Sequence, residues 1–488
     1  MRVESRARSL LPVGCRMPAH IGFVAAFIVA FAPMGLVQAQ SDPTQLTVIH
    51  SFTGVDGKGP VASLILASDG NLYGTTTYGG AENLGTVFRV TPAGGFSTVY
   101  SFDGLVGSYP LVNLMQGSDG NLYGTTANGG EFNSGAIFKL TLSGAATNLY
   151  SFTAPDTNEV NADGFGPHGA LVQASDGNFY GTTFGGVYGG GTIFKISAAG
   201  VLTTLHSFGA VNSFGNKPDG FNPIAGLALS SSGIFYGSTF SGGVNQPTSS
   251  GCNSGGDLEG TPAMGGTIFS VDTGGSVSTL YSFGALRSMD GSAPTSLTIM
   301  SDGNLYGVAE CGGNQGAGVF YMITPTGTLT NIFAFVESST VSGGTPIGIL
   351  LSTADGTGFY GVTEFGGVAN SGVVYRITTA GVLTVLYSFS ATNTSNANQD
   401  GANPAAGVVR DAAGNLYGTT QYGGPAGAGT IFKLSVPTPA GPPPPANTGG
   451  SGGGGGGTLS WQILLLLLVP VAFQSRRAAG RKIGRAHV

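Results

Sequence analysis

A unit of about 50 to 70 residues recurs seven times along this 488-residue chain. Each copy contains a Tyr-Gly pair and a later Gly-Gly pair. Five of the seven then have a Gly-x-(Ile/Val)-Phe segment, and most copies continue to Tyr-Ser-Phe. The seven pairs begin at Tyr73, Tyr123, Tyr180, Tyr236, Tyr306, Tyr360 and Tyr417. Repetition at this period predicts one supersecondary unit per copy, which buries its apolar face only by stacking on its neighbours.

The sequence pattern of each unit predicts four short antiparallel strands, which we name a, b, c and d from first to last. In the second copy they are expected at 111–116, 121–126, 135–140 and 146–152, and Asp119-Gly120-Asn121 is a hairpin turn signal between the first two. No helical period of useful length appears in the repeats. Because a sheet this small cannot bury both faces alone, a ring of such sheets, a β-propeller, is the expected architecture.

The two ends of the repeat region predict how the ring closes. Residues 45–52 form an additional d strand before the first full copy, whereas the seventh copy ends after its c strand at 429–434. If the additional strand completes the last sheet, no sheet edge stays exposed. The sequence therefore predicts an all-β, seven-bladed β-propeller closed by an N-terminal strand that completes the last blade.

The segments outside the repeats have the sequence patterns of export and anchoring signals. Residues 1–39 have basic residues, an apolar run and a small-x-small cleavage site before Gln40, as a Sec signal peptide does. The propeller is expected at 44–436, a Pro/Gly-rich linker at 437–457, and a short hydrophobic anchor with a basic tail at 458–481. Residues 482–488 are interpreted as adapter-derived sequence. We expect export to the cell surface or the extracellular space of a bacterium.

Charge excludes one class of partner. Between residues 40 and 450 there are nine Lys and Arg against 23 Asp and Glu, a net charge of −14, and the repeats contain no basic stripe. Nucleic-acid binding depends on such a basic surface, so no nucleic-acid partner is expected. Membrane contact is expected only through the C-terminal tail, and the protein is expected to be a monomer.

Two resemblances add to this interpretation. The Leu-Tyr-Gly-Thr-Thr, Gly-Gly and Gly-Thr-Val-Phe segments over 45–434 resemble the GloVer tandem repeat of secreted bacterial proteins, whose members carry a choice of C-terminal anchors. The glycines, apolar stretch and Arg pair over 449–477 resemble a GlyGly-CTERM sorting tail. That resemblance implies cleavage by a rhomboid-like sorting protease; the alternative is a short anchor that stays intact.

One face of the predicted ring gathers candidate ligand-binding residues, because the d–a and b–c loops emerge there together. The d–a loops repeat Asp-Gly-x-x-Pro, at Asp56, Asp163, Asp219, Asp290 and Asp400. The b–c loops carry an aromatic residue before Gly-Gly, at Tyr78, Phe184, Phe365 and Tyr422. Such a rim suits sugars, which stack on aromatic rings and hydrogen-bond to carboxylates, and calcium is possible as a cofactor. The alternative is that Asp-Gly before Pro is only a turn device.

A catalytic site requires chemically different side chains at defined positions, so its residues should differ from those repeated in every blade. On the same face the residues that differ are Glu310 and Glu364, in b–c loops of adjacent blades, and His168. They are the candidate acid–base groups of an alternative function, a glycan hydrolase or lyase; otherwise they are solvated loop side chains. His50 and His206 are expected to be packed strand residues. Cys252 and Cys311, in b–c loops of adjacent blades, are predicted to form a disulfide. No metal site is expected, because a metal ion would need more ligands than this pair offers.

The leading hypothesis is therefore a surface-anchored, non-enzymatic propeller that binds or scaffolds an extracellular polysaccharide or protein. The sequence contains no Ser/His/Asp set, His cluster or phosphate-binding loop to support a reaction. A hydrolase or lyase that uses the loop carboxylates is the second hypothesis, and a passive architectural module is the third.

Overall fold

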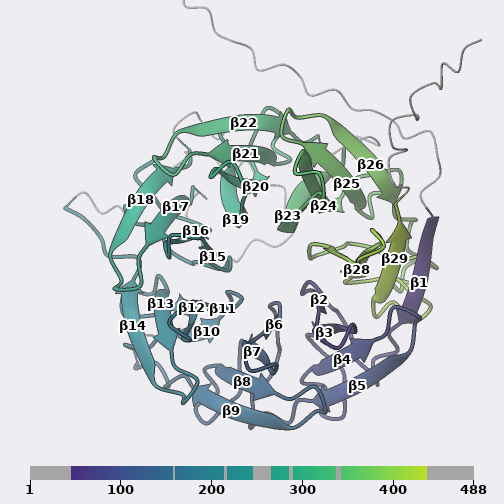
Figure 1. Cartoon of the computed structure of the whole chain (residues 1–488), viewed down its shortest axis with the longest axis horizontal. Coiled ribbons are helices and arrows are strands. Elements are labelled where there is room, and N and C mark those ends of the chain that lie inside the picture. Colours follow the sequence, from purple (N-terminus) through teal and green to yellow (C-terminus); the bar gives the residue numbers. More distant parts are fainter. Residues whose placement is uncertain are drawn as a thin grey trace, which may run out of the picture. The chain divides into compact units, whose positions relative to one another are not determined.

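The computed structural model describes residues 45–157, 160–213, 217–245, 265–284, 289–336 and 342–436. In these residues, seven small antiparallel sheets are arranged in a ring, and no helix is present (Figure 1). The predicted all-β, seven-bladed propeller is thus confirmed. The predicted signal peptide, linker, anchor and adapter-derived end all lie outside the described residues.

The strands follow the predicted order within each blade. The first three blades contain β2 (Ile65–Leu66), β3 (Leu72–Thr76), β4 (Thr86–Val90) and β5 (Phe96–Ser101); β6 (Met115–Gln116), β7 (Leu122–Thr126), β8 (Ala136–Leu140) and β9 (Ala146–Ser151); and β10 (Phe165–Pro167), β11 (Val172–Gln173), β12 (Phe179–Gly185), β13 (Thr192–Ile196) and β14 (Leu202–Ser207). The next two contain β15 (Ala228–Leu229), β16 (Phe235–Thr239), β17 (Thr267–Val271) and β18 (Val277–Ser282); and β19 (Ser292–Ile299), β20 (Leu305–Cys311), β21 (Val319–Ile323) and β22 (Leu329–Ala334). The last two contain β23 (Gly344–Ser352), β24 (Gly358–Phe365), β25 (Val373–Thr378) and β26 (Leu383–Ser388); and β27 (Val409–Arg410), β28 (Leu416–Thr420), β29 (Thr430–Ser435) and β1 (Gln45–Ser51).

Ring closure occurs as the sequence predicts. β1 pairs antiparallel with β29, so that Gln45 lies opposite Ser435 and Ser51 opposite Thr430. Figure 1 shows the purple β1 as the outer strand beside the yellow-green β29. The strand from the beginning of the propeller thereby covers what would otherwise be the open edge of the last blade.

The same glycine–proline contact joins every blade to the next. A glycine before each c strand has a positive φ, and a Cβ at that position would lie 2.5 to 2.7 Å from the proline ring of the following blade. The seven pairs are Gly85–Pro110, Gly135–Pro167, Gly191–Pro223, Gly266–Pro294, Gly318–Pro346, Gly372–Pro404 and Gly429–Pro60. The last pair joins the seventh blade to the first, which means that the joint at closure is built like the other six.

Strand a is shorter than predicted in most blades. The prediction for the second blade was 111–116, but only Met115 and Gln116 pair with β7. The preceding residues lie where the blades converge, and polar groups there bond to the next blade instead. For example, the backbone N–H of Ser63 donates to Asn113 Oδ1 at 2.6 Å. The longer β19 and β23 are the exceptions.

Candidate functional site

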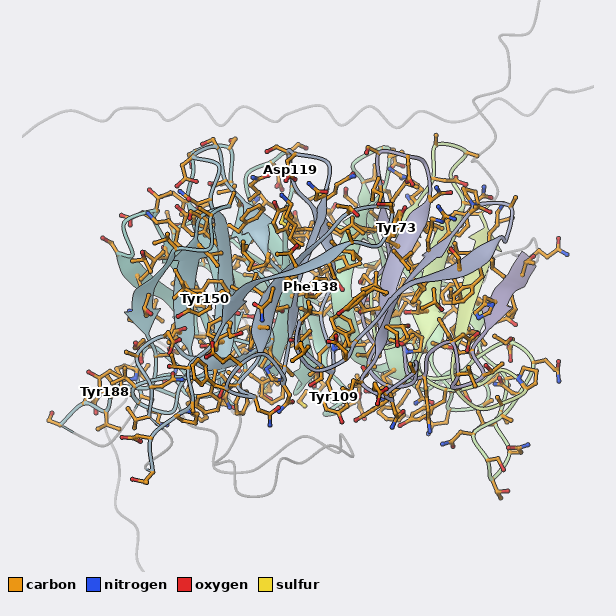
Figure 2. The ribbon with its side chains drawn as sticks, turned by 90° about the horizontal axis from the view of Figure 1, so that it is seen from below. Tyr73, Tyr109, Asp119, Phe138, Tyr150 and Tyr188 are labelled. Carbon is orange, nitrogen blue, oxygen red and sulfur yellow. The ribbon has the colours of Figure 1, made fainter. Side chains whose placement is uncertain are left out.

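The two faces of the ring carry different loops, as the strand order predicts. In the side view of Figure 2, Asp119 of an a–b hairpin lies at one edge, and Tyr109 and Tyr188 of d–a and b–c loops lie at the opposite edge. We call these the hairpin face and the loop face. The predicted site residues belong to the loop face.

The repeated aspartates of the hairpin face complete the hairpins. Asp119 accepts hydrogen bonds from the backbone and side-chain nitrogens of Asn121 (3.1 and 2.8 Å) and from the Tyr123 hydroxyl (2.9 Å), and it pairs with Lys139 at 2.8 Å. Burial by itself would raise the pKa of Asp119, but these partners lower it well below its usual range. Matching Asp–Asn–Tyr sets are formed by Asp69, Asp176 and Asp302.

The five aspartates of the Asp-Gly-x-x-Pro loops are also held within the fold. Each accepts a hydrogen bond from a Tyr hydroxyl or a His nitrogen of the d strand that precedes it. The pairs are His50–Asp56 (2.8 Å), Tyr150–Asp163 (2.8 Å), His206–Asp219 (3.1 Å), Tyr281–Asp290 (2.8 Å) and Tyr387–Asp400 (2.8 Å). Backbone N–H groups such as those of Thr53 and Gly284 add further bonds. These contacts favour the turn interpretation over a role in ligand binding.

The link between the d-strand histidines and these aspartates was not predicted. His50 is packed, as expected, because its ring stacks on Phe96 with centroids 3.6 Å apart, but its Nε2 also holds Asp56. Burial would raise the pKa of Asp56, yet the bonds from Thr53 and His50 lower it overall. A usable signal did exist, since a Tyr or His before Ser-Phe accompanies each of these five aspartates.

The four predicted rim aromatics have different surroundings. Tyr78 is 46% exposed, and Tyr422 is half-buried across the joint between the first and seventh blades. The two line one cleft of about 310 Å³ together with Lys58, Gly59, Asn83 and Gln421. Phe184 contacts the His168 ring at a centroid distance of 5.4 Å, and Phe365 ends β24 opposite Gly344. The ring is therefore not lined by one continuous aromatic belt.

The centre of the ring contains a narrow channel. Its cavity has a volume of about 170 Å³, and one residue from every blade, the residue after the joint proline, contributes to the lining. These seven residues are Val61, Leu111, His168, Ile224, Thr295, Ile347 and Ala405. His168 is the titratable member of the set, Thr295 supplies a hydroxyl group, and the other five residues are aliphatic.

Glu310 reaches the same channel from the end of β20. Burial, and then the charge of Glu364 on the adjacent β24, raise the pKa of Glu310 to about 8. Burial also raises the pKa of Glu364. Both side chains retain partial access to solvent, and neither carboxyl group has a hydrogen-bond partner among the described residues. The pair therefore favours holding a proton at neutral pH.

His168 is held in one orientation. Its Nδ1 donates to the Gly166 carbonyl at 2.7 Å, which leaves Nε2 as an acceptor in the neutral ring. Burial lowers the pKa of His168, although the bond to Gly166 opposes this. Glu310 and His168 thus line one channel, where a protonated carboxyl and a neutral imidazole can both hydrogen-bond to a ligand.

The remaining site predictions concern metal and sulfur. Across the part of the chain that the structure describes, no three His, Cys, Asp or Glu side chains are arranged to hold a metal ion. Cys311 is buried at the end of β20 and is disulfide-bonded. Cys252 lies outside the described residues, so its pairing with Cys311 stays a prediction. Within the described ranges, no helix is long and apolar enough to cross a bilayer.

Comparisons with known proteins identify the repeat. The profile of the Gloeobacter/Verrucomicrobia repeat matches residues 35–163, 216–400 and 266–440. Among curated proteins, no sequence relative was found. Similar solved structures include the extracellular domains of BT3049 and BT4673 from B. thetaiotaomicron, each described as a hybrid two-component system.

These structural likenesses are distant. For BT3049 the identity is 12% and the TM-score 0.49, over 80% of this chain and 41% of that one. For BT4673 the identity is 13% and the TM-score 0.48, and the match covers 81% of this chain and 43% of that one. A protein described as a 6-phosphogluconolactonase from Bacteroides uniformis is 16% identical, with a TM-score of 0.40. The match covers 67% of this chain and 83% of that one. The chain thus spans about two fifths of the first two.

Proposed function

The chain belongs to the Gloeobacter/Verrucomicrobia repeat family, and from that premise we propose that it is an exported propeller that binds an extracellular polysaccharide or protein on its loop face. The observation that carries this proposal is the break in the repeat on that face. Glu310 and His168 enter the channel there from two blades, whereas the repeated aspartates of both faces are bonded within the fold. A concave site with a few convergent polar groups is the usual form of a ligand site.

The location of the protein is part of the same proposal. The Arg-rich start, apolar run and small-x-small site over residues 1–39 support Sec export, and the tail after the linker supports display at the cell surface. A C-terminal sorting protease is then a partner. Calcium as a cofactor would bind to the loop-face carbonyls and carboxylates.

A second function is favoured by one observation, the coupled pair of Glu310 and Glu364. Glycoside hydrolysis uses two carboxyl groups, one of which stays protonated near neutral pH because its pKa is raised. The raised pKa of Glu310, caused by burial and by the neighbouring charge of Glu364, supports this role for Glu310. A hydrolase or lyase would therefore use Glu310 as the acid and Glu364 as the second carboxylate.

Binding and turnover measurements on the same glycans separate the two functions. The full chain would be screened on a glycan array and against extracellular proteins, and every ligand found would then be tested for cleavage. The binding proposal expects retention without product. Turnover that disappears in Glu364→Gln while binding persists would establish the enzyme instead. Failure to bind any glycan or protein would leave the passive module as the remaining explanation and refute both functions.

A further inference from the structure

A cleft beside the closure of the ring differs from the central channel in its chemistry. It lies between the seventh and first blades and is lined by Lys58, Gly59, Tyr78, Asn83, Gln421 and Tyr422. We call it the seam cleft. Its volume of about 310 Å³ is at the lower end of the ~300–1,000 Å³ range of small-ligand sites.

Backbone hydrogen bonds fix both walls of the seam cleft. The Lys58 N–H donates to the Tyr78 carbonyl at 2.8 Å, and the Tyr78 N–H donates to the Lys58 carbonyl at 3.0 Å. This antiparallel bridge places the two side chains next to each other on one side of the backbone. Across the joint, Tyr422 forms the equivalent bridge with Ala402. Gly59 N–H donates to the Ala428 carbonyl at 2.9 Å, which connects the two walls.

The side chains of the cleft are available to a ligand. Tyr78 is 46% exposed, and Lys58 is exposed with no ion pair among the described residues. The nearby Asp56 carboxylate is already held by His50 and Thr53. Asn83 uses its Oδ1 to accept from the Gly79 N–H at 2.9 Å, so its amide nitrogen remains a donor.

Equivalent bridges in other described blades do not pair a lysine with a tyrosine. They pair Ser108 with Asn128 and Phe221 with Ser241, and neither pair supplies a cation. Lys217, the other described lysine on the loop face, lies over the Phe221 ring at 4.3 Å. In an acidic protein, an exposed lysine that is bridged to one tyrosine and lines the same cleft as a second is a specific arrangement rather than a feature of the repeat.

We propose that the seam cleft binds an anionic sugar residue of an acidic polysaccharide, with the sugar against Tyr78 and Tyr422 and its carboxylate on Lys58. The apolar face of a sugar ring packs against aromatic rings, and the Asn83 and Gln421 amides match its hydroxyl groups. The ammonium group supplies a charge-assisted bond to the carboxylate. This inference rests on the proposed extracellular binding function and names the ligand class.

The test compares two trisaccharides that have the same sugar rings and differ in whether their carboxyl groups are charged or esterified. Trigalacturonate and its fully methyl-esterified form would be titrated calorimetrically into the full chain. The wild type is expected to bind the acid about fivefold more tightly than the ester, as for an exposed ion pair. Lys58→Gln is expected to remove this preference while it keeps the affinity for the ester. Tyr78→Ala is expected to weaken both ligands roughly tenfold.

Lys217→Gln is the matched control, because it removes the other described lysine of the same face, and it should leave both affinities unchanged. Equal wild-type affinities, no binding of either trisaccharide, or a preference that survives Lys58→Gln would overturn the proposal. So would tighter binding of a hexa-aspartate peptide, which would make the cleft an acidic-peptide site. Array ligands that bind the wild type and both variants equally, together with no binding of either trisaccharide, would preserve the proposed function while refuting the seam cleft.

Discussion

The hairpin face and the loop face differ in how far the repeat is maintained. On the hairpin face, aspartate, asparagine and tyrosine form nearly the same network in blade after blade. On the loop face, the residue three positions after the repeat glycine varies among the blades. It is Thr77, Ala127, Phe184, Phe240, Glu310, Glu364 and Gln421 in chain order. A residue repeated in all blades maintains the blade, so unrepeated residues are the better guide to function.

Removal of β1 is expected to have the largest effect, because it opens the ring of blades that carries both faces. Deletion of residues 45–52 exposes the edge of β29 and removes the fully buried Phe52, whose loss alone would cost about 3–5 kcal/mol. We expect loss of cooperative unfolding, together with aggregation, in calorimetry and size-exclusion chromatography. A chain that begins at residue 44 is the control. Cooperative unfolding of the deleted form would show that the blades stand without closure.

Glu310→Gln is expected to have the next largest effect, and it tests the loop face alone. Because burial raises the pKa of Glu310 to about 8, the folded state loses stability as the pH rises from the unfolded-state value toward 8. The variant should therefore match the wild type near pH 4.5 and be more stable at pH 9 by up to about 5 kcal/mol, a difference that becomes smaller in proportion to the solvent access of the carboxyl group. Denaturant unfolding at both pH values measures this.

The exposed Glu131→Gln is the matched control for that experiment, and it should follow the wild type at both pH values. A Glu310→Gln protein with the pH dependence of the wild type would mean that Glu310 is fully hydrated. The channel would then no longer be distinguished from the loops around it.

Asp119→Ala is expected to have the smallest effect and to act on the hairpin face alone. It removes hydrogen bonds from Asn121 and Tyr123 and should cost about 1 kcal/mol at pH 7. Since the folded-state pKa of Asp119 is lowered, this stabilisation is present above the unfolded-state pKa and disappears as the pH falls through the folded-state value. Urea unfolding at pH 7 and pH 2 checks it, with the exposed Ser118→Ala as control. A change in ligand affinity would contradict the division between the faces.

Much of the fold could be predicted because the same turn and strand patterns recur in all seven copies of the repeat. Turn signals and alternating strands located the blades, and the additional strand at residues 45–52 located the closure. The extent of strand a could not be predicted in this way. Residues 111–114 leave the sheet because neighbouring blades meet at the axis, and that crowding depends on the whole ring rather than on local sequence.

The candidate site was predicted only in part, for the same reason. Glu310 and His168 were selected because they break the repeat, but their common position in the channel depends on ring closure. Asp411 was missed, although it holds Asn415 and Tyr417 as the hairpin aspartates do, because it lies two positions earlier than its counterparts. Lys58 was also missed, since the cleft in which it is proposed to bind a ligand includes Tyr422 from the far end of the propeller.

The central claim is that ligands contact the loop face and leave the hairpin face free. Hydrogen–deuterium exchange of the full chain, with and without a ligand found on the array, tests it most directly. The account predicts slower exchange in the d–a and b–c loops, including those of Tyr78 and Glu310, and no change in the hairpins of Asp69 and Asp119. Protection of the hairpins with unchanged exchange in those loops would contradict it.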